Sequence, residues 1–161
     1  MVKLLHTVRI NTQRIEKAVR RAEGRALKRS GAYIRTIARR SIRYRKHRWK
    51  GRKGNKKRNV SEEGKPPFAH VRRGKADIRN ILYAYDPKLH MVIIGPEGLR
   101  SRAPTPATAL QEKGGKAPRR LYGGPKITVR LGKRPYMKPA MIKAIESGKL
   151  AEFWQDTVKR Y

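Results

Sequence analysis

Residues 11–42 read NTQRIEKAVRRAEGRALKRSGAYIRTIARRSI, and their apolar positions recur at steps of three and four. This period is typical of an amphipathic α-helix, so we expect one long helix over this range. Asn11 or Thr12 can cap its start, because either side-chain oxygen can accept a backbone N–H. Gly24 and Gly31 each cost about 1 kcal/mol relative to Ala in a helix interior, so each is a candidate position for a kink or break.

The predicted helix has one apolar and one basic face. The apolar face consists of Ile15, Val19, Ala22, Ala26, Leu27, Tyr33, Ile34, Ile37, Ala38 and Ile42. The basic face consists of Arg14, Lys17, Arg21, Arg25, Lys28, Arg35 and Arg39. Only Glu16 and Glu23 oppose these charges. Two interpretations therefore stay open with similar weight, a solvated charged face and a face that binds a polyanion.

The charge of the whole chain also favours a polyanionic partner. Of 161 residues, 43 are Lys or Arg and 11 are Asp or Glu, which gives a formal net charge of +32. Hydrophobic residues make up 37%, below the ~45–50% of an average globular domain, so we expect a single domain over residues 1–161 with a modest core. Self-repulsion at this charge opposes compaction, and nucleic acid is the leading class of partner.

The segment 43–73 differs in character from the helix before it. Ten of the eighteen residues between Arg43 and Val60 are Lys or Arg. Because such a run cannot bury enough surface to offset its ordering entropy, we expect an extended basic arm or loop. Tyr44 and Trp49 either stack on bases or, as we favour, pack at the root of the arm. Sequence-independent phosphate contacts are expected from Arg45, Lys46, Arg48, Lys50, Arg52, Lys53, Lys56, Lys57 and Arg58.

The middle of the chain predicts β structure. Residues 78–85 and 89–94 are rich in apolar side chains and flank Asp86-Pro87-Lys88, which has good turn chemistry. This arrangement predicts an antiparallel hairpin. A third strand is expected over 127–131, where Ile, Val and Leu alternate.

Between these strands, residues 97–125 are rich in Gly and Pro and predict a long loop with one short element around 107–112. Pro135 can open a final helical region, which Ser147-Gly148 ends or bends. The expected fold class is therefore α+β. A long N-terminal amphipathic helix and a C-terminal helix pack on a small antiparallel sheet, and a long basic arm or loop extends from it.

Several chemical functions have no signature in the sequence. The chain has no Cys, its four His are scattered, and its adjacent carboxylates are Glu62-Glu63 in a turn-forming stretch. No phosphate-binding or dinucleotide fingerprint occurs. We therefore expect no enzymatic activity, no catalytic residue, no metal site and no cofactor. The longest apolar run, Met91 to Ile94, is far shorter than the ~20 residues of a membrane span, and no signal peptide is expected. A basic helix lying on an anionic membrane surface is a minor alternative.

The order of short motifs resembles that of the tail-completion or neck proteins of tailed bacteriophages, a virion-morphogenesis family that includes minor tail protein Z-like sequences. The resemblance covers roughly residues 10–160. It rests on Ser30-Gly31-Ala32-Tyr33-Ile34-Arg35, Ala38-Arg39-Arg40-Ser41-Ile42, Ser61-Glu62-Glu63-Gly64-Lys65-Pro66-Pro67, the predicted hairpin, Leu110-Gln111-Glu112-Lys113-Gly114-Gly115 and Arg134-Pro135-Tyr136-Met137-Lys138-Pro139-Ala140. The last of these resembles the family's "arginine-proline-aromatic, then proline-alanine" signature.

The resemblance implies a structural virion protein at the head–tail junction, assembled in the host cytoplasm as a homo-oligomeric ring around the path of viral double-stranded DNA. Its implied neighbours are other neck, connector or tail-tube proteins. The family's residues are structural, so no active site is carried over; those that match its pattern here are Gly64, Pro66, Pro67, Gly114, Gly115, Arg134, Pro135, Pro139 and Ala140. The chain departs from the pattern in its very basic Arg43–Val60 segment and in Lys113, where an aromatic residue is expected.

A ribosomal-type or other RNA-binding structural protein is the alternative, because it shares the charge, the small core and the extended arm. Composition does not separate the two. The Arg134–Ala140 signature and the Gly64–Pro67 turn favour the phage interpretation.

Overall fold

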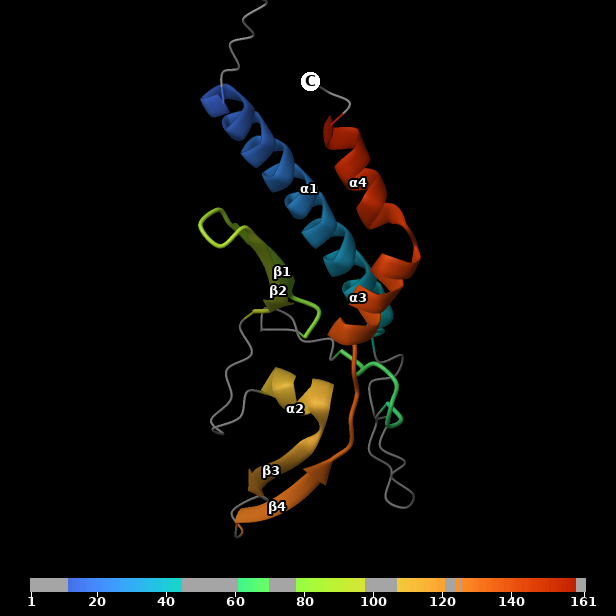
Figure 1. The fold of residues 1–161 in the computed structure, drawn as a ribbon. Coiled ribbons are helices and arrows are strands. Elements are labelled where there is room, and N and C mark those ends of the chain that lie inside the picture. The colour runs from blue at the N-terminus through green and yellow to red at the C-terminus, as the bar shows by residue number, and fades with distance from the viewer. Residues whose placement is uncertain are drawn as a thin grey trace, which may run out of the picture.

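The structure is a computed structural model, and it describes residues 12–44, 61–69, 78–97, 107–120, 124 and 126–158. The chain forms a mixed α+β fold, as the sequence predicts (Figure 1). Its elements in chain order are α1 (Thr12–Ser41), β1 (Ile81–Asp86), β2 (Met91–Pro96), α2 (Ala107–Lys113), β3 (Gly115–Arg120), β4 (Lys126–Leu131), α3 (Met137–Glu146) and α4 (Lys149–Val158).

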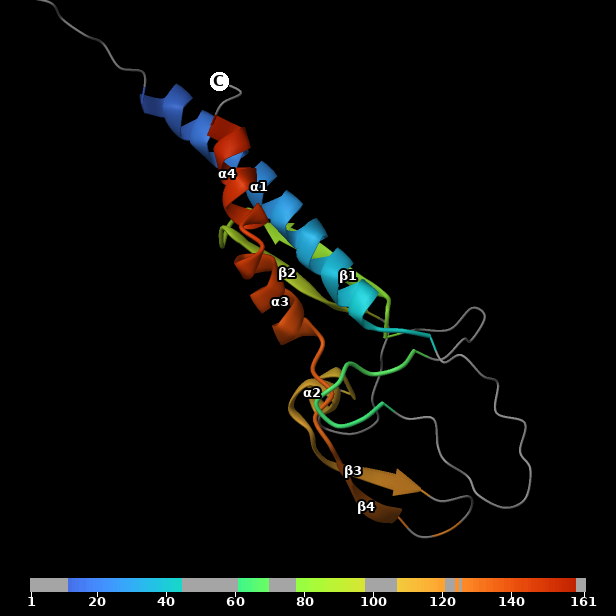
Figure 2. The same ribbon diagram turned by 90° about the vertical axis from the view of Figure 1, so that its right-hand side faces the viewer.

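Helix α1 is the middle layer of the larger part of the molecule. The β1–β2 hairpin covers one side of it, and α3 and α4 cover the other (Figures 1 and 2). The sequence predicted that the C-terminal helix packs on the sheet, whereas α3 and α4 pack mainly on α1. Gly24 faces the ring of Tyr85 from β1, whereas the ring of Tyr33 meets Phe153 of α4 edge to face, with centroids 5.9 Å apart. The nine residues from Gly24 to Tyr33 correspond to two and a half helical turns, so the two contacts lie on opposite sides of α1.

The two glycines of α1 do not break it, because the helix is continuous from Thr12 to Ser41. A Cβ at Gly31 would lie 3.0 Å from Cδ2 of Tyr83 and 3.1 Å from Cγ2 of Val92. A Cβ at Gly24 would lie 3.3 Å from Cε1 of Tyr85. The glycines therefore allow close approach of the hairpin, and this packing offsets their low helix propensity.

Within the described ranges, the strands form two separate two-stranded antiparallel sheets, not one. The β1–β2 hairpin, which pairs Ile81 with Pro96 and Asp86 with Met91, confirms the predicted hairpin. Asp86 organises its turn, since Oδ1 accepts hydrogen bonds from the N–H groups of Lys88 and Leu89.

The strand expected over 127–131 exists as β4, but its partner is β3 and not the first hairpin. Strand β3 lies within 97–125, where the Gly/Pro-rich composition predicted a loop, while α2 matches the short element expected there. The β3 sequence Gly-Lys-Ala-Pro-Arg-Arg has no alternation of apolar residues. Its ladder with β4 therefore depends on backbone pairing, which the hydrophobic pattern does not reveal.

The C-terminal helical region consists of α3 and α4, separated at Ser147-Gly148 as predicted. Gly148 has φ +69, a left-handed conformation that glycine adopts without steric cost. The expected apolar face of α1 is buried only in part, because Ile15 and Val19 near its start are 51% and 59% exposed.

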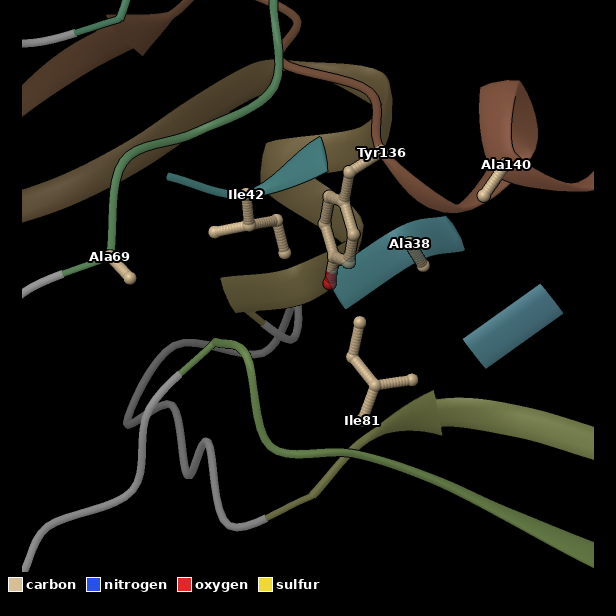
Figure 3. Close-up of a cluster of buried hydrophobic side chains, with 6 residues drawn as sticks. All are labelled: Ala38, Ile42, Ala69, Ile81, Tyr136 and Ala140. Carbon is tan, nitrogen blue, oxygen red and sulfur yellow. The ribbon is translucent and has the colours of Figure 1, made fainter. Parts of the chain in front are cut away.

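The core lies where α1, β1 and the start of α3 meet (Figure 3). The ring of Tyr136 projects from the segment before α3 into the space between Ile42, Ala38 and Ile81, and its side chain is 1% exposed. The buried cluster consists of Ala38, Ile42, Ala69, Ile81, Tyr136 and Ala140. This is the modest core that the composition predicts.

Candidate nucleic-acid interface

The nine basic residues expected to contact phosphates, Arg45 to Arg58, lie outside the described residues. The structure does describe both ends of the segment that carries them. Tyr44 and Ala69 form a parallel β-bridge, and the N–H of Ala69 donates to the carbonyl of Arg43 at 2.9 Å. The guanidinium carbon of Arg79 lies 4.2 Å from the centroid of the Tyr44 ring, within cation–π range. Tyr44 therefore contacts Arg79 beside the segment, but its side chain is 47% exposed, so its two predicted roles both stay predictions.

A depression of about 620 Å³ opens at this root. Its lining includes Arg40, Arg43 and Lys65, together with Ser61, whose buried hydroxyl has no hydrogen-bond partner among the described residues. The Lys65 Nζ atom lies 2.6 Å from a carboxylate oxygen of Glu62. The hydrogen bond and charge of Lys65 lower the pKa of Glu62 below its ordinary value. The lining thus carries three cations and one carboxylate, and that carboxylate is paired with Lys65.

The predicted basic face of α1 is present, with one exception. Its exposed members are Arg14, Lys17, Arg21, Arg25, Lys28 and Arg39, and Arg20 and Arg40 are exposed as well. Arg35 is instead half-buried, and its Nε donates to the carbonyl of Ile81 at 2.8 Å. The side chain therefore ties α1 to β1, which the helical pattern alone does not predict.

The β3–β4 hairpin, which we call the basic ribbon, is a second cationic surface. Residues 115–131 contain five Lys or Arg and no Asp or Glu. The ribbon projects from the lower end of the molecule in Figure 1, where it packs against α2. The register sets Lys116 opposite Arg130 and Arg120 opposite Lys126. Sequence reasoning assigned most of this segment to a loop and so missed it, although the absence of acidic residues was a visible signal.

Two other surfaces are apolar and carry little charge. The outer face of the first hairpin, named here the hairpin face, exposes Leu82, Ala84, Met91 and Ile93. The outer face of α3, named here the α3 face, exposes Met141, Ile142 and Ile145. Ile93 is 59% and Ile145 is 58% exposed. The two faces lie on opposite sides of α1, since the hairpin and α3 cover opposite sides of that helix.

The sequence around these apolar faces is electrically balanced. Residues 81–96 contain one Asp and one Lys, and residues 137–158 contain three acidic residues and three lysines. In contrast, α1 carries ten Lys or Arg against two Glu. The charge of the described residues is therefore concentrated away from the apolar faces.

Three segments that carry the family resemblance meet beside the core. The Glu112 carboxylate accepts hydrogen bonds from the backbone N–H groups of Tyr136, Met137 and Lys138 at 3.0, 3.2 and 2.8 Å. Arg134 Nε donates to the carbonyl of Ser61 at 2.9 Å. The carboxylate satisfies the exposed donors at the start of α3 and interacts favourably with the helix dipole.

Burial, and to a smaller extent the charge of Glu112, raises the pKa of the adjacent Tyr136 to about 12. This junction holds elements together, and its geometry offers no nucleophile paired with a base. The role of Glu112 was missed because a capping residue 24 positions before its helix leaves no local pattern.

Among the described residues, no cluster of three or more His, Cys, Asp or Glu side chains could hold a metal ion. Within the same ranges, each helix falls short of the length and apolarity required to cross a membrane. Comparison of the chain with protein-family models, with curated proteins and with solved structures gave no significant match.

Proposed function

We propose that this protein is a structural virion component of a bacteriophage neck or tail top, which completes the head–tail junction and contacts the DNA path through sequence-independent phosphate binding. The observation that carries the proposal is the separation of charge from apolar surface. A chain with a net charge of +32 exposes two apolar faces on segments without net charge, and places its described positive charge elsewhere.

The two apolar faces support self-assembly. Large exposed apolar patches on a soluble protein mark sites of interaction with other proteins. The hairpin face and the α3 face differ in structure and lie on opposite sides of α1. A contact between different faces of two copies is heterologous, and such contacts close into a ring when the rotation per subunit allows it.

The basic surfaces support contact with duplex DNA. The Lys and Arg residues of α1, of the basic ribbon and of residues 45–58 can neutralise phosphates without reading bases. Repulsion between copies of so basic a chain would oppose a ring in free solution, and a polyanion in its channel would relieve that repulsion.

The sequence resemblance supports the remaining parts of the proposal. It implies a position at the head–tail junction of the virion, beside other neck, connector or tail-tube proteins, after assembly in the host cytoplasm. The convergence of its Ser61–Pro67, Leu110–Gly115 and Arg134–Ala140 segments gives these motifs a joint structural purpose.

Electron microscopy of the purified protein tests the proposal, with and without duplex DNA at two salt concentrations. We expect rings that associate with DNA at low salt and release it at high salt. A monomer that prefers structured RNA would contradict the proposal and support the ribosomal-type alternative. A monomer that binds neither would contradict it as well.

The variant Ile93→Asp sharpens this test on the hairpin face. Because Ile93 is exposed, we expect the free energy of unfolding to change by no more than about 0.5 kcal/mol, while the rings dissociate. The matched control is Gln13→Asp, which adds the same charge at an exposed position of α1. Rings that survive Ile93→Asp would exclude this face as the subunit contact.

A further inference from the structure

The basic ribbon combines two features that are unfavourable in the free protein. It places like charges directly opposite each other, Lys116 with Arg130 and Arg120 with Lys126, and cross-strand pairs of like charge are destabilising. It also has no acidic residue between positions 115 and 131 that could compensate. The described side chains of Lys116 and Arg130 are both exposed, so no buried partner offsets this pair.

We infer that the basic ribbon is a binding element for the phosphate backbone of duplex DNA, separate from the basic segment 45–58. This inference rests on the proposed function and names a site for its DNA contact. A polyanion removes the cost of the like-charge pair of Lys116 and Arg130, because the pair then presents two cations to neighbouring phosphates. Binding thus stabilises the element that makes the contact.

The ladder geometry fits a duplex. Positions 116 and 120 of β3 are four residues apart, as are positions 126 and 130 of β4. At ~3.3 Å per residue, the two like-charge pairs are ~13 Å apart along the ribbon. Side chains alternate between the faces of a strand, so all four positions belong to one face. The major groove of B-DNA, ~12 Å wide, admits a two-stranded ribbon of this kind.

The position of the ribbon in the fold leaves it accessible. It extends away from α1, α3 and α4, and its contact with the rest of the described structure is mainly through α2 (Figures 1 and 2). At the base of the ribbon a Cβ on Gly115 would lie 3.2 Å from Cδ2 of Leu110, so the anchor is compact. A ribbon held only at its base can enter a groove without displacing the layers around α1.

The test compares two double variants of the full chain that remove the same charge. The variant Lys116→Ala/Arg130→Ala alters the ribbon, and Lys143→Ala/Lys149→Ala alters exposed lysines on the neutral C-terminal helices. Affinity for a duplex of random sequence is measured by fluorescence anisotropy over a range of salt concentrations. The slope of log affinity against log salt is ~0.9 per phosphate contact, so we expect the ribbon variant to lose about 2 from its slope. The control variant should keep the wild-type slope.

Each outcome is decisive. If wild-type protein binds duplex DNA and both variants share its slope, the ribbon inference is wrong while the proposed function stands. If wild-type protein does not bind duplex DNA even at low salt, both are wrong. A ribbon variant with a smaller slope supports both.

Hydrogen exchange on the unmodified protein supplies a second measurement that does not depend on a variant. Bound DNA should slow amide exchange in residues 115–120 and 126–131 more than in α3 and α4. DNA binding that leaves exchange in the ribbon unchanged would overturn the inference.

Discussion

The described residues form two antiparallel hairpins of equal strand length, and these hairpins differ in their charge and in their packing. The first, β1–β2, is neutral, and one face packs on α1 while the other exposes apolar side chains. The second, β3–β4, carries basic residues and no acidic ones, and it contacts mainly α2. The same backbone motif therefore presents two surfaces of opposite chemistry, one suited to protein and the other to a polyanion. The net charge of the chain hides this division.

The largest expected effect concerns the junction between the two regions. In Glu112→Ala, the N–H groups of Tyr136, Met137 and Lys138 lose their acceptor. Because hydrogen bonds to charged groups contribute about 1.5–3 kcal/mol, we expect a loss of about 3 kcal/mol in the free energy of unfolding, measured by urea titration. The control, Glu152→Ala, removes an exposed carboxylate from α4 and should change stability by less than about 0.5 kcal/mol. Equal stability of the two variants would show that the cap is dispensable.

A smaller effect is expected from alkaline titration of the core. The pKa of Tyr136 is raised to about 12, so the folded state retains a proton that the unfolded chain releases near pH 10. The contribution of Tyr136 to the free energy of unfolding is fully present below pH 10, declines as the pH rises towards 12 and is lost above it. The total loss is about 2 kcal/mol. Urea titrations at pH 9 to 12 measure this decline. In Tyr136→Phe the part due to Tyr136 should disappear, and an unchanged decline would assign it to other groups.

The smallest expected effect is a change in the stability of the basic ribbon in the absence of DNA. Lys116→Glu converts the pair with Arg130 into one of opposite charge. We expect the free energy of unfolding to rise by about 0.2–1 kcal/mol, since cross-strand pairs contribute within that range. Thermal unfolding measured in low salt detects the change. A decrease in stability would mean that the like-charge pair carries no repulsion in the free protein.

Periodic patterns in the sequence predicted the helices and the first hairpin, but not their layering, because α3 and α4 pack mainly on α1 and not on a sheet. The steps of three and four in residues 11–42, the turn at Asp86-Pro87-Lys88 and the break at Ser147-Gly148 all appear in the structure. These features are local, so each can be read from a few neighbouring residues. The fold class follows from their order.

The sequence did not predict contacts between residues that lie far apart in the chain. Strand β3 has no apolar alternation, Arg35 binds a carbonyl 46 positions away, and Glu112 caps a helix 24 positions later. In each case the partner is chosen by the folded backbone and leaves no local pattern. Of the predicted DNA-binding residues, the nine between Arg45 and Arg58 lie outside the described ranges, so they remain a prediction.

The small residues of α1 have a consequence for how the hairpin is placed along the helix. Gly24, Gly31 and Ala38 recur every seven residues, and in that order they face Tyr85, Tyr83 and the cluster around Ile81. A slip of one helical turn, ~5.4 Å, would replace Gly24 and Gly31 at the closest approach by the larger side chains three or four residues away. These three small residues therefore allow the hairpin one axial position on the helix. A force that pulls the β1–β2 hairpin along the axis of α1 would therefore meet steric resistance before the hairpin and the helix separate.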